Sequence, residues 1–137
     1  MSTKFFKCRR CGNVVIKTVD SGIPLSCCGE QMEEIVPNTQ DLYAEKHLPV
    51  VIRLDDGTIR VKVGELPHPM NPDHSIRFIL VETENGFSIR YLSLSDPSEA
   101  NFCIPFEKVK AVYEYCNVHG LWMASMAGCC TGGGQCK

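Results

Sequence analysis

The sequence predicts a mainly β protein, with a small Cys-dense module followed by a β-sandwich of about seven strands. Three observations support this fold class. Short apolar segments alternate with turn dipeptides such as Asp56-Gly57 and Asn85-Gly86, which are typical of hairpins. No segment keeps a helical period of apolar residues over three turns. Four of the nine Cys fall within the first 28 of 137 residues, which sets that part of the chain apart.

The composition is that of a globular protein with one unusual feature, its sulfur content. Hydrophobic residues make up 44% of the chain, and a net charge of -2 disfavours a general nucleic-acid binder. No apolar run approaches the ~18 residues that span a bilayer, and the basic N-terminus has no apolar stretch of a signal peptide. An odd number of Cys without an export signal indicates a reducing compartment, where clustered Cys bind metal. We therefore expect a cytoplasmic metalloprotein with no nucleic-acid or membrane partner.

The first module is expected to cover residues 1–36. Short strands are predicted at Lys4–Lys7 and Val14–Val19, on either side of the first Cys pair, and a turn is predicted at Asp20–Pro24. A unit of this size cannot be stable on its apolar core alone, and a bound metal would supply the missing stability. The stretch Pro37–Thr39 is predicted to be the linker to the next domain.

The second domain is expected to cover residues 37–127, and residues 128–137 are expected to form a flexible Gly- and Cys-rich tail. The segment Val109–Tyr115 alternates apolar with polar side chains, as a half-buried strand does. These segments indicate an antiparallel sandwich. The predicted strands are Val50–Leu54, Thr58–Val63, Ile76–Glu82, Ser88–Leu94 and Val109–Tyr115.

The first candidate site is a group of four thiols, Cys8, Cys11, Cys27 and Cys28, within 21 residues. A C-x-x-C turn followed by Gly12 points two sulfurs at one ion, and tetrahedral four-sulfur sites hold iron or zinc. Neighbouring strand residues point to opposite faces, so a local bend at Cys27-Cys28 must bring both sulfurs inward. The alternatives are a zinc knuckle that only holds the fold and a set of disulfides. The ligand type alone does not distinguish iron from zinc.

The second candidate site uses every His in the chain together with one Cys. Cys116-x2-His119 is a chelating pair at the end of a strand. His68 and His74 lie in a loop with three prolines, which excludes a regular helix and restricts both imidazoles. His47 follows Glu45 and Lys46 directly. Imidazoles and a thiolate suit a transition metal such as iron, and five ligands leave one octahedral position for chemistry.

These motifs carry two resemblances to known families. Residues 1–36 resemble desulforedoxin, a small rubredoxin-like iron module with an adjacent second Cys pair. The order EKH-LP, HPMNPDH and CNVHG resembles the superoxide reductases, or desulfoferrodoxins, over about residues 4–126. The resemblance implies an immunoglobulin-like β-sandwich, a homodimer and two iron ions per chain. The first iron would be bound by Cys8, Cys11, Cys27 and Cys28, and the second, catalytic iron by His47, His68, His74, His119 and axial Cys116.

The same resemblance implies the reaction, a one-electron reduction of superoxide to hydrogen peroxide. Glu45 and Lys46 would be the active-site pair: Lys46 would attract the superoxide anion and assist protonation, and Glu45 would ligate ferric iron after turnover. A rubredoxin-like protein would be the electron donor. Two other hypotheses are a rubredoxin-like electron carrier with a non-catalytic second iron, and a metal-stabilised sandwich that binds a partner. Cys103 is expected to be a core residue, and Cys129, Cys130 and Cys136 in the tail have no assigned chemistry.

Overall fold

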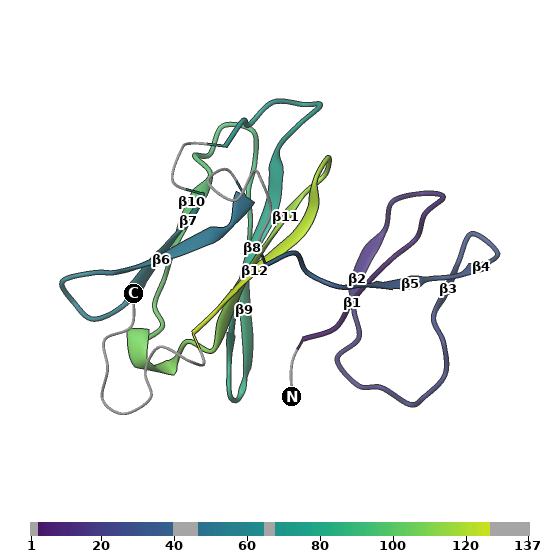
Figure 1. Cartoon of the computed structure of the whole chain (residues 1–137), viewed down its shortest axis with the longest axis horizontal. Helices are drawn as coiled ribbons and strands as arrows, with labels where there is room; N and C mark the ends of the chain where they lie inside the picture. Colours follow the sequence, from purple (N-terminus) through teal and green to yellow (C-terminus); the bar gives the residue numbers. More distant parts are fainter. Residues whose placement is uncertain (1–2, 40–46, 65–67, 127–137) are drawn as a thin grey trace. The chain divides into compact units, whose positions relative to one another are not determined.

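The computed structural model describes residues 3–39, 47–64 and 68–126, and the architecture is mainly β (Figure 1). The chain divides into two compact units, Met1–Val36 and Pro37–Lys137. The predicted tail at 128–137 lies outside the described residues. Among the described residues, no helix has the length and apolar character that crossing a membrane would require.

The first unit contains two small antiparallel sheets. β1 (Phe5–Lys7) is the central strand of the first sheet, between β2 (Val14–Ile16) and β5 (Glu33–Ile35). The second is a two-stranded ribbon of β3 (Ser26–Cys27) and β4 (Glu30–Gln31). The two predicted strands are confirmed, although β2 ends three residues before the predicted end. Strands β3, β4 and β5 were not predicted, because segments of two or three residues are too short to show an alternation of apolar and polar residues.

The described residues of the second unit form seven strands in two antiparallel sheets, in agreement with the predicted sandwich of about seven strands. One sheet has the order β10-β7-β6 and the other the order β12-β11-β8-β9. Apolar side chains of β7, β8 and β11 form most of the core cluster. The strands are β6 (Pro49–Arg53), β7 (Ile59–Val63), β8 (Ile76–Thr83), β9 (Gly86–Tyr91), β10 (Glu99–Phe102), β11 (Ala111–Cys116) and β12 (Gly120–Ser125), with a short 3-10 helix η1 (Phe106–Lys108).

Both predicted hairpins are present. β6 and β7 pair around the turn with Asp56, whose carboxylate accepts a hydrogen bond from the Thr58 amide at 2.9 Å, and Gly57 has φ 87°. β8 and β9 pair from Thr83 opposite Gly86 onwards, so the turn lies one residue earlier than the predicted Asn85-Gly86.

Two predictions about burial are wrong. β11 is buried at all six positions rather than half-buried, because it is an inner strand of its sheet and both faces are covered. Cys103 is exposed rather than in the core. Ala100 and Phe102 of β10 point into the core, and the two-residue alternation of a strand directs Asn101 and then Cys103 outward.

Candidate metal centres

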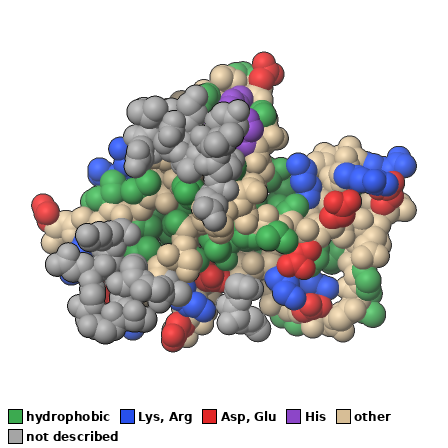
Figure 2. All heavy atoms as spheres, in the orientation of Figure 1, with side chains coloured by type: hydrophobic (Ala, Val, Ile, Leu, Met, Phe, Trp, Pro, Cys, Tyr) green, Lys and Arg blue, Asp and Glu red, His purple; other side chains and the backbone are tan. Residues whose placement is uncertain are grey.

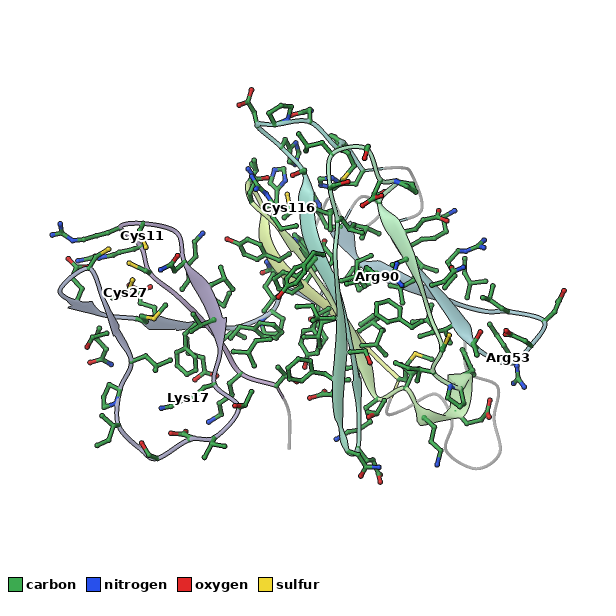
Figure 3. All side chains as sticks on the ribbon, turned by 180° about the vertical axis from the view of Figure 1, so that it is seen from behind. Cys11, Lys17, Cys27, Arg53, Arg90 and Cys116 are labelled. Carbon is green, nitrogen blue, oxygen red and sulfur yellow. The ribbon has the colours of Figure 1, made fainter. Side chains whose placement is uncertain are left out.

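The four predicted Cys ligands of the first unit lie together in the structure. Their sulfur atoms are all within 4.8 Å of one another. The sulfurs of Cys11 and Cys27 are 3.6 Å apart, and those of Cys27 and Cys28 are 3.9 Å apart (Figure 3). A tetrahedral ion with metal–sulfur bonds of about 2.3 Å places its sulfurs about 3.8 Å apart. The spacing fits one tetrahedral metal ion, and all four thiols are free rather than disulfide-bonded.

The backbone around the adjacent pair makes the bend that the sequence requires. Cys28 has φ 54°, in the left-handed region that non-glycine residues seldom adopt, and Gly29 follows with φ 75°. Gly12 after the first pair has φ 84° and donates its amide to the Cys8 carbonyl at 2.9 Å. These turns direct consecutive sulfurs to the same point, which a regular strand cannot do.

The electrostatics of the four thiols favour a bound cation. The backbone N–H of Cys11 lowers the pKa of the Cys8 thiol to about 6. The other sulfurs, Cys11 first, raise the pKa of Cys28 to about 12. One thiolate therefore forms readily, but further negative charge is opposed at such short distances unless a cation compensates it. The donor set and its charge both fit a metal ion bound by four thiolates.

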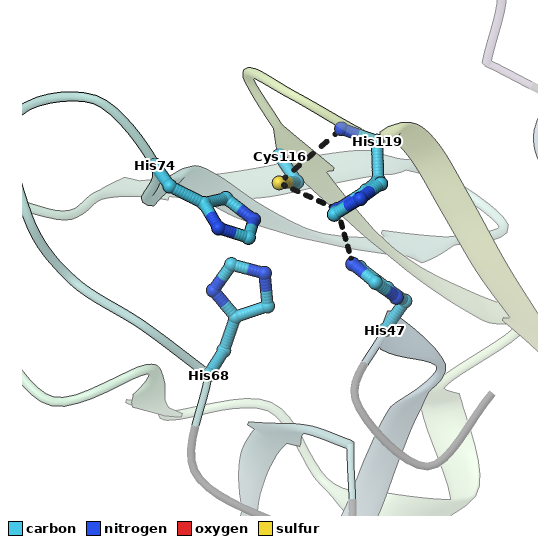
Figure 4. A group of neighbouring side chains, drawn as sticks. All are labelled: His47, His68, His74, Cys116 and His119. Atoms are coloured by element: carbon cyan, nitrogen blue, oxygen red, sulfur yellow. Dashed lines mark hydrogen bonds between the residues drawn. The ribbon is translucent and has the colours of Figure 1, made fainter. Parts of the chain in front are cut away.

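The second group lies in the sandwich, where loops and strand ends bring five ligand atoms within 4.8 Å of one another. The four imidazole rings follow one another in a closed circuit (Figure 4). The ring centroids are 5.2 Å apart for His47 and His68, and 4.6 Å apart for His68 and His74. The circuit closes through His119, whose ring lies 4.9 Å from His74 and 4.4 Å from His47.

A β-bulge places the single thiol of this group. Along the β11–β8 pair, Tyr115 lies opposite Phe78 but Cys116 lies opposite Ile76, so Arg77 is the extra residue. Such bulges redirect a side chain at the end of a strand. Cys116 is fully buried, and its sulfur accepts the His119 amide at 3.4 Å. Burial raises the pKa of the Cys116 thiol, so the thiolate that a metal requires forms when a cation is bound.

His68 is prepared as a neutral ligand. His68 is 4% exposed and its Nδ1 lies 2.7 Å from the Pro69 carbonyl oxygen, so Nδ1 donates and Nε2 keeps its lone pair. Burial lowers the pKa of His68 to about 4, which keeps the ring neutral at physiological pH. The Nε2 atom of His68 is buried and has no hydrogen-bond partner among the described residues. A buried nitrogen that keeps its lone pair fits a metal ion bound by the four imidazoles.

Three residues that the sequence analysis did not single out hold these ligands. Asn117 accepts the Ser75 amide and donates to the Asp73 carbonyl, each at 2.9 Å, which ties the loop of His74 to the turn of Cys116. Asn71 accepts the His74 amide at 2.9 Å. Asx side chains inside a ligand motif are a signal that could have identified both.

The third is Trp122, the single Trp of the chain. Its ring is stacked on that of His47 with centroids 4.8 Å apart, and its Nε1 donates to the His119 carbonyl at 3.2 Å. The nine predicted metal ligands thus lie in two separate groups, four in the first unit and five in the second. Glu45 and Lys46 lie outside the described residues. His119 is exposed, and histidine atoms reach the visible surface in the space-filling view (Figure 2).

A β-sandwich with a four-His, one-Cys site, preceded by a separate four-Cys module, defines a class of non-haem iron proteins with two centres. The chain belongs to the desulfoferrodoxin family: residues 39–125 match the desulfoferrodoxin family model and residues 2–35 the model of its N-terminal domain. The two groups of ligands fit the two iron centres of desulfoferrodoxin.

Individual relatives agree with this assignment. A desulfoferrodoxin homolog of Methanothermobacter thermautotrophicus is 40% identical over 121 residues, which are 88% of this chain and 97% of the relative. A desulfoferrodoxin of Nitratidesulfovibrio vulgaris is also 40% identical, over 88% of this chain and 94% of the relative. The crystal structure of the superoxide reductase from Treponema pallidum is similar with a TM-score of 0.75, 28% identity and coverage of 90% of this chain and 98% of that one.

Proposed function

We propose that the chain is a superoxide reductase, which converts one superoxide anion, one electron and two protons into hydrogen peroxide. The observation that carries this proposal is the convergence of four imidazoles and one buried thiol, whose five ligand atoms lie within 4.8 Å of one another. When bound there, ferrous iron supplies the electron. Five protein ligands leave one position of an octahedral ion for the substrate.

The proposed roles of the ligands follow from their chemistry. His47, His68, His74 and His119 would hold the iron through imidazole nitrogens, and His68 is neutral at physiological pH. Cys116 would hold the iron through its thiolate, a strong electron donor that would favour reduction of the substrate by the metal. Asn117 and Trp122 hold these ligands in place, so that little rearrangement is needed during turnover.

Rapid mixing of the iron-loaded protein with a pulse of superoxide tests the reaction. A superoxide reductase consumes superoxide and forms peroxide without the oxygen that dismutation releases. An electron carrier with a non-catalytic second iron would leave the superoxide decay at its uncatalysed rate. That alternative is not favoured, because the similar structure from Treponema pallidum is that of a superoxide reductase.

Glu45 and Lys46 form the proposed catalytic pair, since both directly precede the ligand His47. A Lys ammonium close to the vacant position raises the local concentration of a small anion and donates hydrogen bonds to the product. Glu45 is proposed as the carboxylate that ligates the ferric ion after turnover.

Lys46→Ala should lower the second-order rate constant for superoxide by about tenfold and flatten its dependence on salt. The reason is the loss of a cation that steers the substrate, an effect that salt screens. Stopped-flow measurements between low and high ionic strength provide both quantities. Lys108→Ala, in η1, is the matched control and should change neither. An unchanged rate constant and salt slope in Lys46→Ala would exclude the steering role.

The four-Cys iron is proposed to be redox-active but dispensable for turnover at the other centre. Cys8→Ser should remove the iron of the first unit and leave the superoxide rate within about twofold of the unaltered protein, since independent sites behave additively. The measurement combines iron content, the thiolate absorption of the first centre and the stopped-flow rate. Complete loss of activity in a folded variant would show that this centre is required.

Further proposals concern the electron donor, the oligomeric state, the location and the domains of the enzyme. We propose a rubredoxin-like electron donor, a homodimer and a cytoplasmic location, the last because the Cys usage fits a reducing compartment. Residues 1–36 and 37–127 are proposed to be the two functional domains. Sedimentation of the iron-loaded protein would test the dimer, and donor-dependent turnover would test the rubredoxin-like partner.

A further inference from the structure

An ion-pair cluster in the first unit connects the two turns that carry the four thiols. Arg9 and Arg10 lie between Cys8 and Cys11, and Glu30 lies two residues after Cys28. Nε of Arg9 and Nε of Arg10 each lie 2.8 Å from a different oxygen of the Glu30 carboxylate. A second Arg9 nitrogen lies 3.4 Å from the oxygen that Arg10 contacts. The Glu30 carboxylate therefore links the turn between Cys8 and Cys11 to the turn after Cys28, and these are called the ligand turns below.

The bridge differs from an ordinary surface ion pair in its geometry. The Arg9 and Arg10 side chains are 71% and 64% exposed, whereas Glu30 is 25% exposed. Isolated exposed pairs contribute little, but a network with bidentate contacts is the recognised exception. No covalent bond joins the two Cys turns near the sulfurs, and the β3–β4 ribbon that flanks the second turn has only two residues in each strand. A bridge at this point restricts how far the turns can separate.

We propose that Glu30, through Arg9 and Arg10, is a positioning residue that holds the two ligand turns together and sets the charge beside the four-cysteine iron. This inference rests on the iron assignment of the first unit and not on the reaction at the His site. Two guanidiniums and one carboxylate leave a net charge of +1 beside a thiolate-bound iron. Positive charge favours the reduced, more negative state of such a centre, and negative charge opposes it.

Substitutions on the acidic and the basic side of the bridge should therefore have the same effect on iron release and opposite effects on the midpoint potential. Glu30→Gln and Arg10→Gln both break the bridge, so both should accelerate the release of iron from this centre to a chelator, by about fivefold. Their effects on the midpoint potential should have opposite signs. Glu30→Gln removes a negative charge and raises the potential, whereas Arg10→Gln removes a positive charge and lowers it.

The experiment uses the iron-loaded full chain and needs no superoxide. The absorption of the four-cysteine iron gives the release rate with a ferrous chelator, and a redox titration gives the potential. Asp20→Asn is the matched control, because it breaks the Lys17–Asp20 ion pair of the same unit, at 2.7 Å, without touching a ligand turn. It should leave both quantities unchanged.

The outcomes are decisive in both directions. Faster release in both bridge variants with opposite shifts of the potential supports the proposal. Release rates equal to those of Asp20→Asn, or potential shifts of the same sign, would overturn it. Glu30→Asp adds a further check, since it keeps the charge but shortens the reach: release should accelerate while the potential stays near that of the unaltered protein. Because the superoxide rate is not used, failure here leaves the proposed function untouched.

Discussion

Cys116→Ser should lower the second-order rate constant for superoxide by at least about 100-fold and remove the thiolate absorption of the His-site iron. The loss of an outer-shell partner already costs up to about 100-fold in metal affinity or activity, and Cys116 is proposed as a direct ligand. Serine fills the same fully buried space at the β-bulge. Its hydroxyl, however, is neither a soft donor nor an anion at neutral pH.

The measurement combines stopped-flow kinetics with iron content and the optical spectrum of each variant. Cys103→Ser is the matched control, because Cys103 is exposed and belongs to neither ligand group. This variant should keep the rate, the iron content and both spectra. A Cys116→Ser protein that retained iron and reacted within a few-fold of the unaltered rate would show that the thiolate is not essential.

The ligand groups could be predicted from the sequence because spacing within short motifs limits what the backbone can do. Cys27-Cys28 required a bend, and Cys28 supplies it with φ 54°. Cys116-x2-His119 required a turn at a strand end, and Gly120 follows with φ 88° as β12 begins. The closed order of the imidazole rings could not be predicted, because it depends on three loops that meet only in the folded sandwich.

Errors in the prediction arose where long-range packing decides burial. The alternation in β11 indicates one exposed face, yet this strand lies between β8 and β12 with both faces covered. Strands β10 and β12 were not predicted, although β12 carries Trp122, which stacks on His47. The alternation of apolar and polar residues shows which side chains share a face of a strand. The packing of neighbouring elements decides whether that face is exposed to water.

Glu114 is the clearest consequence of that packing. It lies in β11 on the same face as the core residues Val112 and Cys116, with 0% of its surface exposed. Neither carboxylate oxygen has a hydrogen-bond partner among the described residues. Burial raises the pKa of Glu114 well above its ordinary value of 4.5, so the folded protein keeps this side chain protonated. A buried acid without partners is costly for the fold.

Glu114→Met should therefore stabilise the metal-free protein by about 2–4 kcal/mol at neutral pH, since it replaces a buried polar group with an apolar one of similar volume. The gain should depend on pH. Below about pH 4.5 the carboxyl is protonated in both the folded and the unfolded state, so it adds no pH dependence to the free energy of unfolding. Above that pH the unfolded state ionises while the folded state does not, so the unaltered protein loses stability until the raised folded pKa is reached.

Denaturant unfolding of both proteins at several pH values checks this expectation. From about pH 5 upward, the difference in free energy of unfolding should grow by up to about 1.4 kcal/mol per pH unit. Glu114→Gln is the control, because its amide is buried but cannot ionise, and its stability relative to the Met variant should be flat with pH over this window. A difference between Glu114 and Met that stayed constant from pH 5 to pH 8 would mean that the folded protein accommodates an ionised carboxylate.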